Sequence, residues 1–349
     1  MNRSSQDEVL TIAQRPTAPR ADLDRVLVIK LGALGDFVQA LGVARLIREY
    51  HVGARVTLLT TEPFENLAKA CPYFDLVESD GRPSEPSRAA QLVSRMRSAR
   101  FDMVYDFQTN ERSSFYFQAM RPWPPLWSGI SPGCAYPHAN PEREHMHTLD
   151  RLADQLRFAG YPEELIDPHP LPDLSWIRRA LRDPPRLQPE FFNIKPPYVL
   201  IAPGASGHRP EKRWPAEKFA ELAGRIASRG ITPVIIGSAD EREIGGLIGA
   251  RERRAKVIVS RTDLFQLAAL AERAAGCVGN DTGPMHLAAA AGAPCVVLFD
   301  TRVSESDRVA PRGRGGVLSL VSPDLAEVDP AEVDRALGNV GAYAAAKTP

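Results

Sequence analysis

Short apolar runs alternate along this chain with segments in which apolar residues recur at helical spacing. The first half has four such runs, at residues 25–30, 55–60, 76–79 and 102–108. Helical spacing is clearest between them, over residues 36–50 and 87–99. The second half has five runs, at residues 198–204, 232–238, 255–260, 275–281 and 293–300. Alternation of this kind predicts mostly parallel sheets with helices on both faces, an α/β fold.

A proline-rich stretch separates the two alternating halves. Residues 162–197 hold nine prolines and carry no strand pattern, which is typical of an interdomain connection. We therefore predict a mobile N-terminal segment over residues 1–22 and a doubly wound Rossmann-like domain over residues 23–160. A proline-rich linker over residues 161–197 leads to a second doubly wound Rossmann-like domain over residues 198–349. A ligand is expected in the cleft between the domains, where the carboxyl ends of both sheets face each other.

Composition excludes several classes of protein. The 43 basic and 43 acidic residues cancel, which counts against a nucleic-acid partner. No run approaches the roughly 20 apolar residues of a membrane-spanning helix, and the N-terminus lacks the apolar centre of a signal peptide. The four cysteines are scattered, which indicates neither a zinc site nor a disulfide framework. The chain is predicted to be cytoplasmic.

The segment KLGALGDFVQA, residues 30–40, joins the first strand to the first helix. Its small residues allow a ligand to come close, and Asp36 is expected at the first residue of the helix. A carboxylate there caps the free N–H groups of the helix. Alternatively, it faces a ligand at the carboxyl end of the strand. The stretch alone leaves both interpretations open.

The segment GNDTGPMHLAAAAGAP, residues 279–294, is the most specific stretch of the second half. Its turn contains Asp281, Thr282 and Gly283, and a helix is expected to begin near Pro284. Free N–H groups and the helix dipole favour an anion, and Gly283 lets it approach the backbone. An ordinary capped turn is the alternative. His286 either faces the ligand or is a packed histidine with satisfied hydrogen bonds.

Two other segments of the second half carry candidate ligand groups. Lys212 precedes a Trp-Pro pair at the edge of a loop, where a cation supplies charge to a diphosphate. The alternative is a solvated Lys-Arg pair. Glu241, with Asp240 as second choice, follows a strand end, where a carboxylate commonly binds ribose hydroxyls. A charged first helical turn explains Glu241 equally well.

The segment YDFQTNERSS, residues 105–114, places four polar residues beyond a strand end: Asp106, Gln108, Asn110 and Arg112. They can hold a hydroxylated or anionic acceptor, or they form a solvated loop. The pair of histidines in HMH, residues 145–147, has no carboxylate constellation beside it, so no metal is assigned.

Four stretches together resemble glycosyltransferase family 9, the ADP-heptose:lipopolysaccharide heptosyltransferases and their relatives. They occur in the same order over nearly the whole chain: VLVIKLGALGDFVQAL, DFQTNERSS, KRWPAEKFAELA and GNDTGPMHLAAAAGAPCVVLF. The resemblance implies a GT-B architecture, with the acceptor in the N-terminal domain and an ADP-sugar in the C-terminal domain. It also implies inverting transfer without a metal or other cofactor. The implied acceptor belongs to the lipopolysaccharide core, which would bring the enzyme to the inner face of the cytoplasmic membrane.

The resemblance also implies roles for single residues. Asp36 takes the position of the catalytic base. The donor-binding candidates are Lys212, Glu241, Asp281, Thr282, Gly283 and His286. The acceptor-binding candidates are Lys30, Gly35, Gln108, Asn110 and Arg112. Three positions depart from the family pattern: Gly42 and Asp300 stand where many members carry Pro and Gly, and Lys30 replaces a frequent Arg.

Three other functions compete with an inverting glycosyltransferase. A GT-B-fold nucleotide-sugar epimerase shares the diphosphate cradle but needs no grip on an acceptor. A non-catalytic nucleotide-sugar-binding protein has no need of Asp36. An NAD-dependent oxidoreductase requires GxGxxG after the first strand, which GALGD lacks. The sequence therefore favours the transferase.

Overall fold

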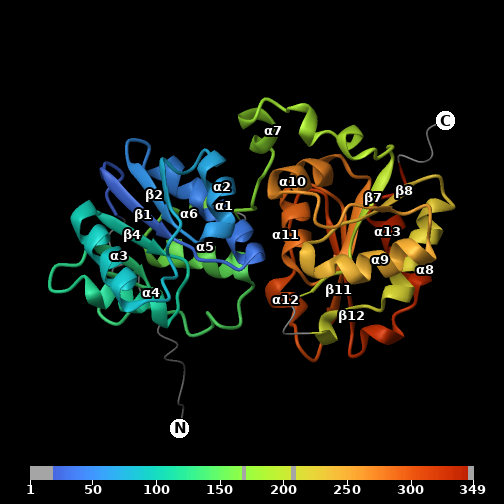
Figure 1. Ribbon diagram of the computed structural model, residues 1–349. Coiled ribbons are helices and arrows are strands. Elements are labelled where there is room, and N and C mark those ends of the chain that lie inside the picture. The colour runs from blue at the N-terminus through green and yellow to red at the C-terminus, as the bar shows by residue number, and fades with distance from the viewer. Residues whose placement is uncertain (1–18, 167–169, 206–209, 345–349) are drawn as a thin grey trace, which may run out of the picture.

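The computed structural model describes residues 19–166, 170–205 and 210–344. These residues form two α/β domains, each built on a six-stranded parallel sheet (Figure 1). The strand orders are β3-β2-β1-β4-β5-β6 and β12-β11-β10-β7-β8-β9. Counted from the first strand of each domain, the two sheets are wound in the same order. The predicted doubly wound α/β architecture is confirmed.

The N-terminal sheet explains the apolar runs of the first half. Its strands are β1 (Arg25–Ile29), β2 (Arg55–Leu59), β3 (Leu76–Glu78), β4 (Met103–Asp106), β5 (Leu126–Gly129) and β6 (Tyr136–Pro137). Four of the five β1 residues are buried, as expected for a parallel strand covered on both faces. The helices are α1 (Leu34–Tyr50), α2 (Glu65–Ala70), α3 (Pro86–Ala99), α4 (Glu111–Ala119) and α5 (Thr148–Phe158). The sequence prediction missed β5 and β6, which are short and lie among prolines.

The linker contains short helical turns and, in its described part, no strand. Its turns are α6 (Glu163–Ile166), α7 (Trp176–Ala180), η3 (Pro185–Leu187) and η4 (Pro189–Phe192). Prolines begin the last two turns, where a missing N–H costs nothing. The linker contacts the second domain through a main-chain hydrogen bond, in which the Leu174 N–H donates to the Ala290 carbonyl at 3.2 Å. In Figure 1 the segment with α7 crosses from one domain to the other along one side.

The C-terminal sheet follows the expected runs of the second half and adds one strand. Its strands are β7 (Tyr198–Ala202), β8 (Thr232–Ile235), β9 (Lys256–Val257), β10 (Gly276–Asn280), β11 (Cys295–Asp300) and β12 (Val317–Ser322), the last of which was not predicted. The helices are α8 (Ala216–Ala227), α9 (Arg242–Arg251), α10 (Leu264–Arg273), α11 (Gly283–Ala290), α12 (Ser306–Val309) and α13 (Pro330–Asn339). The described residues of this domain also form the 3₁₀ turns η5 (Pro210–Lys212), η6 (Ala239–Glu241) and η7 (Leu325–Glu327).

The two domains meet where α1 packs on α11, in the middle of the molecule (Figure 1). Glycines make this approach possible. A Cβ at Gly283 would lie 2.8 Å from the Leu34 Cβ, and one at Gly42 would lie 1.8 Å from the Pro170 carbonyl oxygen. The linker therefore occupies the space that a larger residue at position 42 would need. A second interdomain contact joins α5 to the segment after α12, where Arg312 pairs with Asp150 at 2.8 Å.

Among the described helices, none is both long enough and apolar enough to cross a membrane.

Candidate active site

Asp36 lies in the first turn of α1 but does not cap it. The helix begins at Leu34, so Asp36 is its third residue, and the N-cap residue Ala33 makes no side-chain bond. The prediction that Asp36 is the first residue of the helix is wrong, because the chain enters the helix two residues earlier, and of the two interpretations left open the cap is not made. The Asp36 carboxylate is half-buried and has no hydrogen-bond or ion-pair partner among the described residues. It is therefore available to a ligand.

Lys30 lies beneath this carboxylate, at the end of β1. Its ammonium group is buried and donates to the Phe107 carbonyl at 3.1 Å. Burial lowers the pKa of Lys30, and the nearby carboxylates of Asp36 and Asp106 oppose that shift. The structure thus places this acceptor-binding candidate behind the surface of the cleft, where its charge and that of Asp36 attract each other.

Asp106 and Gln108 tie the ends of β1 and β4 together. The Gln108 side-chain oxygen accepts the Leu31 N–H at 2.8 Å. Asp106 is fully buried, and its Oδ1 accepts the N–H groups of Gln108 and Thr109, both at 3.0 Å. Burial raises the pKa of the Asp106 carboxyl to about 6. Gln108 thus positions the loop that leads to Asp36.

The two remaining acceptor candidates of this segment have structural partners. The exposed Asn110 caps α4, since its side-chain oxygen accepts the Ser113 N–H at 3.1 Å. Arg112 is exposed, and its guanidinium group donates to the Pro83 carbonyl at 3.2 Å. The solvated-loop interpretation therefore fits Asn110 and Arg112 better than it fits Gln108.

His286 and Gly35 meet across the domain interface. A Cβ at Gly35 would lie 2.7 Å from the His286 ring, so Gly35 makes room for this ring. His286 is buried, and its Nδ1 lies 3.1 Å from the Gln39 side-chain nitrogen. Burial lowers the pKa of His286, opposed by Asp281 and Asp36, which favours the neutral ring. With Nδ1 accepting from the amide, the ring proton lies on Nε2. This contact fits the packed-histidine interpretation, and the role of His286 in donor binding stays a prediction.

Lys212 and Asp281 form a close pair on the donor side. The Lys212 ammonium lies 2.5 Å from Asp281 Oδ2, and the Ser304 hydroxyl donates to the same oxygen at 2.6 Å. Both partners are largely buried, so the interpretation of Lys212 as a solvated surface cation is wrong. They line a hollow of about 650 Å³ together with residues of the segment 301–309.

The first turn of α11 separates this hollow from a second one. Gly283 is the first residue of α11, and Leu34 packs on it, so this glycine makes room for the other domain. Thr282 is the N-cap residue but makes no side-chain bond to the helix. Thr282 and Pro284 line the second hollow, of about 340 Å³, opposite Glu241 and Leu264.

Glu241 borders this second hollow from η6. Its Oε2 accepts both the N–H and the hydroxyl of Ser238, each at 2.7 Å. A Cβ at Gly204 would lie 2.6 Å from the Glu241 side chain, which shows how closely the carboxylate lies over the end of β7. The charged-turn interpretation describes its Ser238 contacts, while its position beside the hollow fits the ribose-binding prediction.

Two positioning residues escaped the sequence analysis, Asn280 and Gln39. Asn280 is fully buried at the end of β10, where its Oδ1 accepts the Trp214 N–H at 3.0 Å and its Nδ2 donates to the Pro203 carbonyl at 2.8 Å. It thereby holds two loops of the donor side in place. Both residues could have been found in the sequence, because each is a polar residue within a run of apolar or small residues, Gln39 in α1 and Asn280 at the end of β10.

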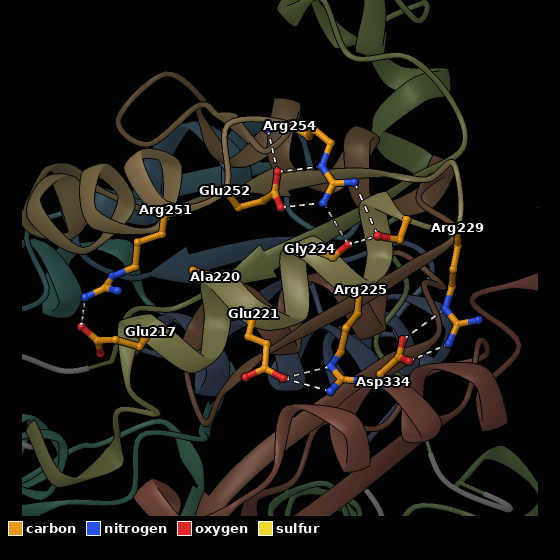
Figure 2. Close-up of a pocket in the computed structure, with 11 residues that line it drawn as sticks. Glu217, Ala220, Glu221, Gly224, Arg225, Arg229, Arg251, Glu252, Arg254 and Asp334 are labelled. Atoms are coloured by element: carbon orange, nitrogen blue, oxygen red, sulfur yellow. Dashed lines mark hydrogen bonds and ion pairs between the residues drawn. The ribbon is translucent and has the colours of Figure 1, made fainter.

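A further hollow, of about 770 Å³, lies on the outer face of α8, α9 and α13, and we call it the outer groove. Figure 2 shows that its arginines point to neighbouring carboxylates. The pairs and distances are Arg225–Glu221 at 2.9 Å, Arg229–Asp334 at 2.6 Å, Arg251–Glu217 at 3.1 Å and Arg254–Glu252 at 2.8 Å. Because these charges neutralise one another, the outer groove is a poor candidate for a charged ligand.

In the part of the chain that the structure describes, no three histidine, cysteine, aspartate or glutamate side chains are grouped so that they could hold a metal ion.

Comparison with known proteins agrees with this geometry. The family model described as Glycosyltransferase family 9 (heptosyltransferase) matches residues 89–314. Lipopolysaccharide heptosyltransferase 1 of Pseudomonas aeruginosa is 38% identical over 294 residues, which cover 79% of this chain and 78% of that protein.

Solved structures show the same architecture at low sequence identity. The family 9 glycosyl transferase of Veillonella parvula matches with a TM-score of 0.77 and 19% identity, over 93% of this chain and 98% of that chain. The ADP-heptose lps heptosyltransferase II of Escherichia coli matches with a TM-score of 0.72 and 22% identity, over 90% and 98%. The predicted GT-B architecture is confirmed.

Proposed function

The chain belongs to glycosyltransferase family 9, and on that premise we propose that it transfers a heptose from ADP-heptose to a sugar of the lipopolysaccharide core. The name of the Pseudomonas relative supports heptose and lipopolysaccharide, and that of the Escherichia coli structure supports the ADP-linked donor. The observation that carries the proposal is Asp36, a carboxylate without a partner among the described residues, close to the first turn of α11.

In the proposed reaction, Asp36 accepts the proton of the acceptor hydroxyl as its oxygen attacks the anomeric carbon. The bond to the nucleoside diphosphate breaks on the opposite face of the sugar, so the configuration at that carbon inverts. The transition state resembles an oxocarbenium ion. A general base of this kind contributes roughly 10²–10⁴-fold to the rate. Because Asp36 is not used as a helix cap, its lone pairs are available for this proton.

The leaving diphosphate is stabilised from the C-terminal domain. We place the nucleoside in the hollow beside Glu241, because its lining combines that carboxylate with the apolar side chains of Ile236, Leu264 and Leu267. The diphosphate then lies at the start of α11, where the helix dipole favours negative charge. The Lys212 ammonium either leaves Asp281 for the phosphates or contacts Asp281 and the phosphates together. In both cases it supplies preorganised positive charge to the leaving diphosphate. The proposed reaction uses no metal or other cofactor.

His286 has a positioning role in this proposal. The ring fixes α1 to α11 through Gln39 and Gly35, so that Asp36 and the donor motif keep a defined separation. The acceptor then enters from the N-terminal domain, past Gln108 and above the buried Lys30. We place the enzyme on the cytoplasmic side of the membrane that carries such an acceptor.

Titration calorimetry with ADP, UDP and GDP tests the donor assignment. We expect selective ADP binding and a loss of roughly tenfold or more in affinity for Lys212→Ala, since a hydrogen bond to a charged group is involved. Lys69→Ala, which removes an exposed lysine paired with Glu65, is the matched control and leaves binding unchanged. Selective UDP or GDP binding contradicts the ADP-heptose donor. Binding of none of the three contradicts a nucleotide-sugar donor altogether.

Turnover tests the reaction itself. With ADP-heptose and a lipopolysaccharide-core acceptor, we expect a new glycosidic product that requires both substrates. Conversion of the nucleotide sugar without any acceptor would indicate an epimerase instead.

A further inference from the structure

Exposed aromatic side chains gather along one flank of the N-terminal domain. Phe115 on α4 is 55% exposed, and Trp123 in the loop after α4 is 88% exposed. Among the described residues, Phe191 is the one other exposed aromatic side chain. We call α4, the loop 120–125 and the last turn of α3 the α4 flank. In Figure 1, α3 and α4 lie on the side of the N-terminal domain that faces away from the other domain.

The exposure of these aromatic rings is built into the local structure. On α4, Tyr116 and Phe117 are buried and fix the helix to the sheet, which leaves Phe115 on the outer face. Prolines at 122, 124 and 125 surround Trp123 and restrict the backbone of its loop. The indole is thus held in solvent by a stiff segment, which is costly for a large apolar group unless something covers it.

The charges on the α4 flank are positive and lack partners of opposite sign. Arg97, Arg100, Arg112 and Arg121 are all exposed, and none forms an ion pair with a carboxylate of the described residues. Arg97 and Arg121 use their guanidinium groups on main-chain carbonyls. Together with Arg100 and Trp123 they line a hollow of about 560 Å³.

Carboxylates also lie near these arginines. Asp102, also in the hollow, accepts the N–H groups of Asp24 and Arg25, at 3.1 and 2.8 Å. Glu111 is exposed in the first turn of α4, and Asp80, which lies near Arg112, is paired with Arg95. Since none of these acids pairs with the four arginines, the guanidinium charges of the flank suit an anionic surface.

The α4 flank begins at the proposed acceptor site. Asn110 caps α4 directly after the Asp106–Gln108 segment, at the carboxyl edge of the sheet, and Trp123 lies three residues before β5. Because Trp123 and the hollow around Asp102 precede β5 and β4, they lie at the amino edge of the sheet, at the other end of α4 from the cleft. The flank therefore extends from the acceptor side of the cleft to the opposite edge of the domain.

We propose that the α4 flank binds the surface of an anionic lipid bilayer. Trp123 and Phe115 enter the headgroup region, and the arginines contact lipid phosphates while their stems cover apolar surface. The proposed function explains why such a surface is useful, since its acceptor is lipid-linked, but the binding itself requires neither substrate.

Tryptophan fluorescence provides a direct test with the full chain. The protein has four tryptophans, and Trp127, Trp176 and Trp214 are buried at 0%, 6% and 0% exposure, so iodide quenches mainly Trp123. Vesicles of phosphatidylethanolamine and phosphatidylglycerol, without any acceptor, are expected to protect it from iodide and shift its emission to the blue. High salt and vesicles of phosphatidylcholine alone are expected to remove most of this protection.

Co-sedimentation of variants with the same anionic vesicles measures each contribution. We expect Trp123→Ala to weaken binding roughly tenfold, as for the loss of one buried large apolar side chain. Arg121→Gln is expected to weaken it about fivefold, as for one basic residue near the surface. Phe115→Ala lowers binding too, whereas Phe191→Ala on the linker and Arg253→Gln on the other domain serve as controls and leave it unchanged.

Two results would overturn the proposal. One is a Trp123 that stays fully quenchable with anionic vesicles at low salt, which would leave a protein partner as the occupant of this surface. The other is vesicle binding that Trp123→Ala and Phe115→Ala do not alter. The vesicle measurements contain no nucleotide or acceptor, so a negative result would contradict bilayer binding but not the proposed transfer reaction. In the same way, a lack of transfer activity would not contradict vesicle binding.

Discussion

The outer groove and the Asp36 side of the cleft differ in how their charged side chains are paired. In the outer groove, the hydrogen bond from Arg254 lowers the pKa of Glu252 to about 2. Beside the cleft, burial raises the pKa of Asp106 to about 6 and lowers that of Lys30. Asp36 itself has no ion-pair partner among the described residues.

This difference separates charges that serve the fold from charges that are held ready for a ligand. Exposed ion pairs satisfy each other and are screened by water, so each adds little to stability. Charged groups kept near one another without close partners cost stability, and such groups concentrate at functional sites. Pocket size alone would have favoured the outer groove, at about 770 Å³ against about 340 Å³ beside Glu241. The state of the charges favours the cleft.

The largest expected effect is that of Asp36→Asn on turnover. We expect kcat to fall roughly 10²–10⁴-fold, because the amide cannot accept the proton of the acceptor hydroxyl. The melting temperature should fall only slightly, since the carboxylate has no hydrogen bond or ion pair to lose and Asp106 still offsets the charge of Lys30. Steady-state kinetics and calorimetry measure both. Turnover close to that of the parent would remove Asp36 from the role of general base.

Gly35→Ala tests whether the interface between the domains positions the site. Its new methyl group would lie 2.7 Å from the buried His286 ring, so ring or helix must move, and kcat is expected to fall on the order of tenfold to a hundredfold. Gly224→Ala is the matched control in a helix of the outer groove. There the nearest atom is the end of the Glu252 side chain at 3.0 Å, and higher helix propensity should raise stability by up to about 1 kcal/mol. Equal kinetics of the two variants would contradict this contrast.

Asp106→Asn tests the cost of the buried carboxyl. The folded-state pKa is raised from 3.8 to about 6, so the folded protein holds this proton more tightly than the unfolded chain does. The contribution of Asp106 to the free energy of unfolding is therefore highest below pH 3.8 and falls, by about 3 kcal/mol, as the pH rises to about 6. The variant should lack this fall in urea unfolding measured across that pH range.

Glu252→Gln provides the opposite sign for the same measurement. The pKa of Glu252 is lowered from 4.5 to about 2, so its stabilising pair with Arg254 is present above the first value and lost as the pH falls toward the second. The stability of the parent minus that of the variant should fall with rising pH for Asp106→Asn and rise with pH for Glu252→Gln, and the same sign for both differences would contradict the comparison.

The smallest expected effect is that of Glu221→Ala in the outer groove. Its pair with Arg225 is exposed and lies within one helix, at 2.9 Å, and removing it should change the free energy of unfolding by no more than about 0.5 kcal/mol. Turnover should not change. A loss of activity here would mean that the outer groove takes part in function.

The sequence predicted the fold through its buried strands. The β1 run RVLVI and the β11 run CVVLFD are continuous apolar segments, which parallel strands between helices require. Strand β12 was missed because its residues 317–322 are only partly buried and mix serine with apolar side chains. Strand β5 was missed because it is four residues long and follows three prolines.

The candidate site was predicted by residue type better than by contact. The pattern around Asp36 identified a turn between strand and helix, but it could not show that the helix begins at Leu34. It identified Gly35 and Gly283 as points of close approach, yet the approaching groups are His286 and Leu34 of the opposite domains. Contacts between distant segments depend on how the two domains pack, which local spacing does not encode.

The equal winding of the two sheets has a consequence for recombination. Each sheet is completed by its own part of the chain, and over residues 19–344, as far as they are described, the strands of one domain all precede those of the other. Halves of two family members can therefore be joined in the linker if the surfaces of α1 and α11 still match, with Gly35 against His286 and Leu34 against Gly283. Under the proposed division of labour, donor choice and acceptor choice are then separate traits that can be inherited, or exchanged, one at a time.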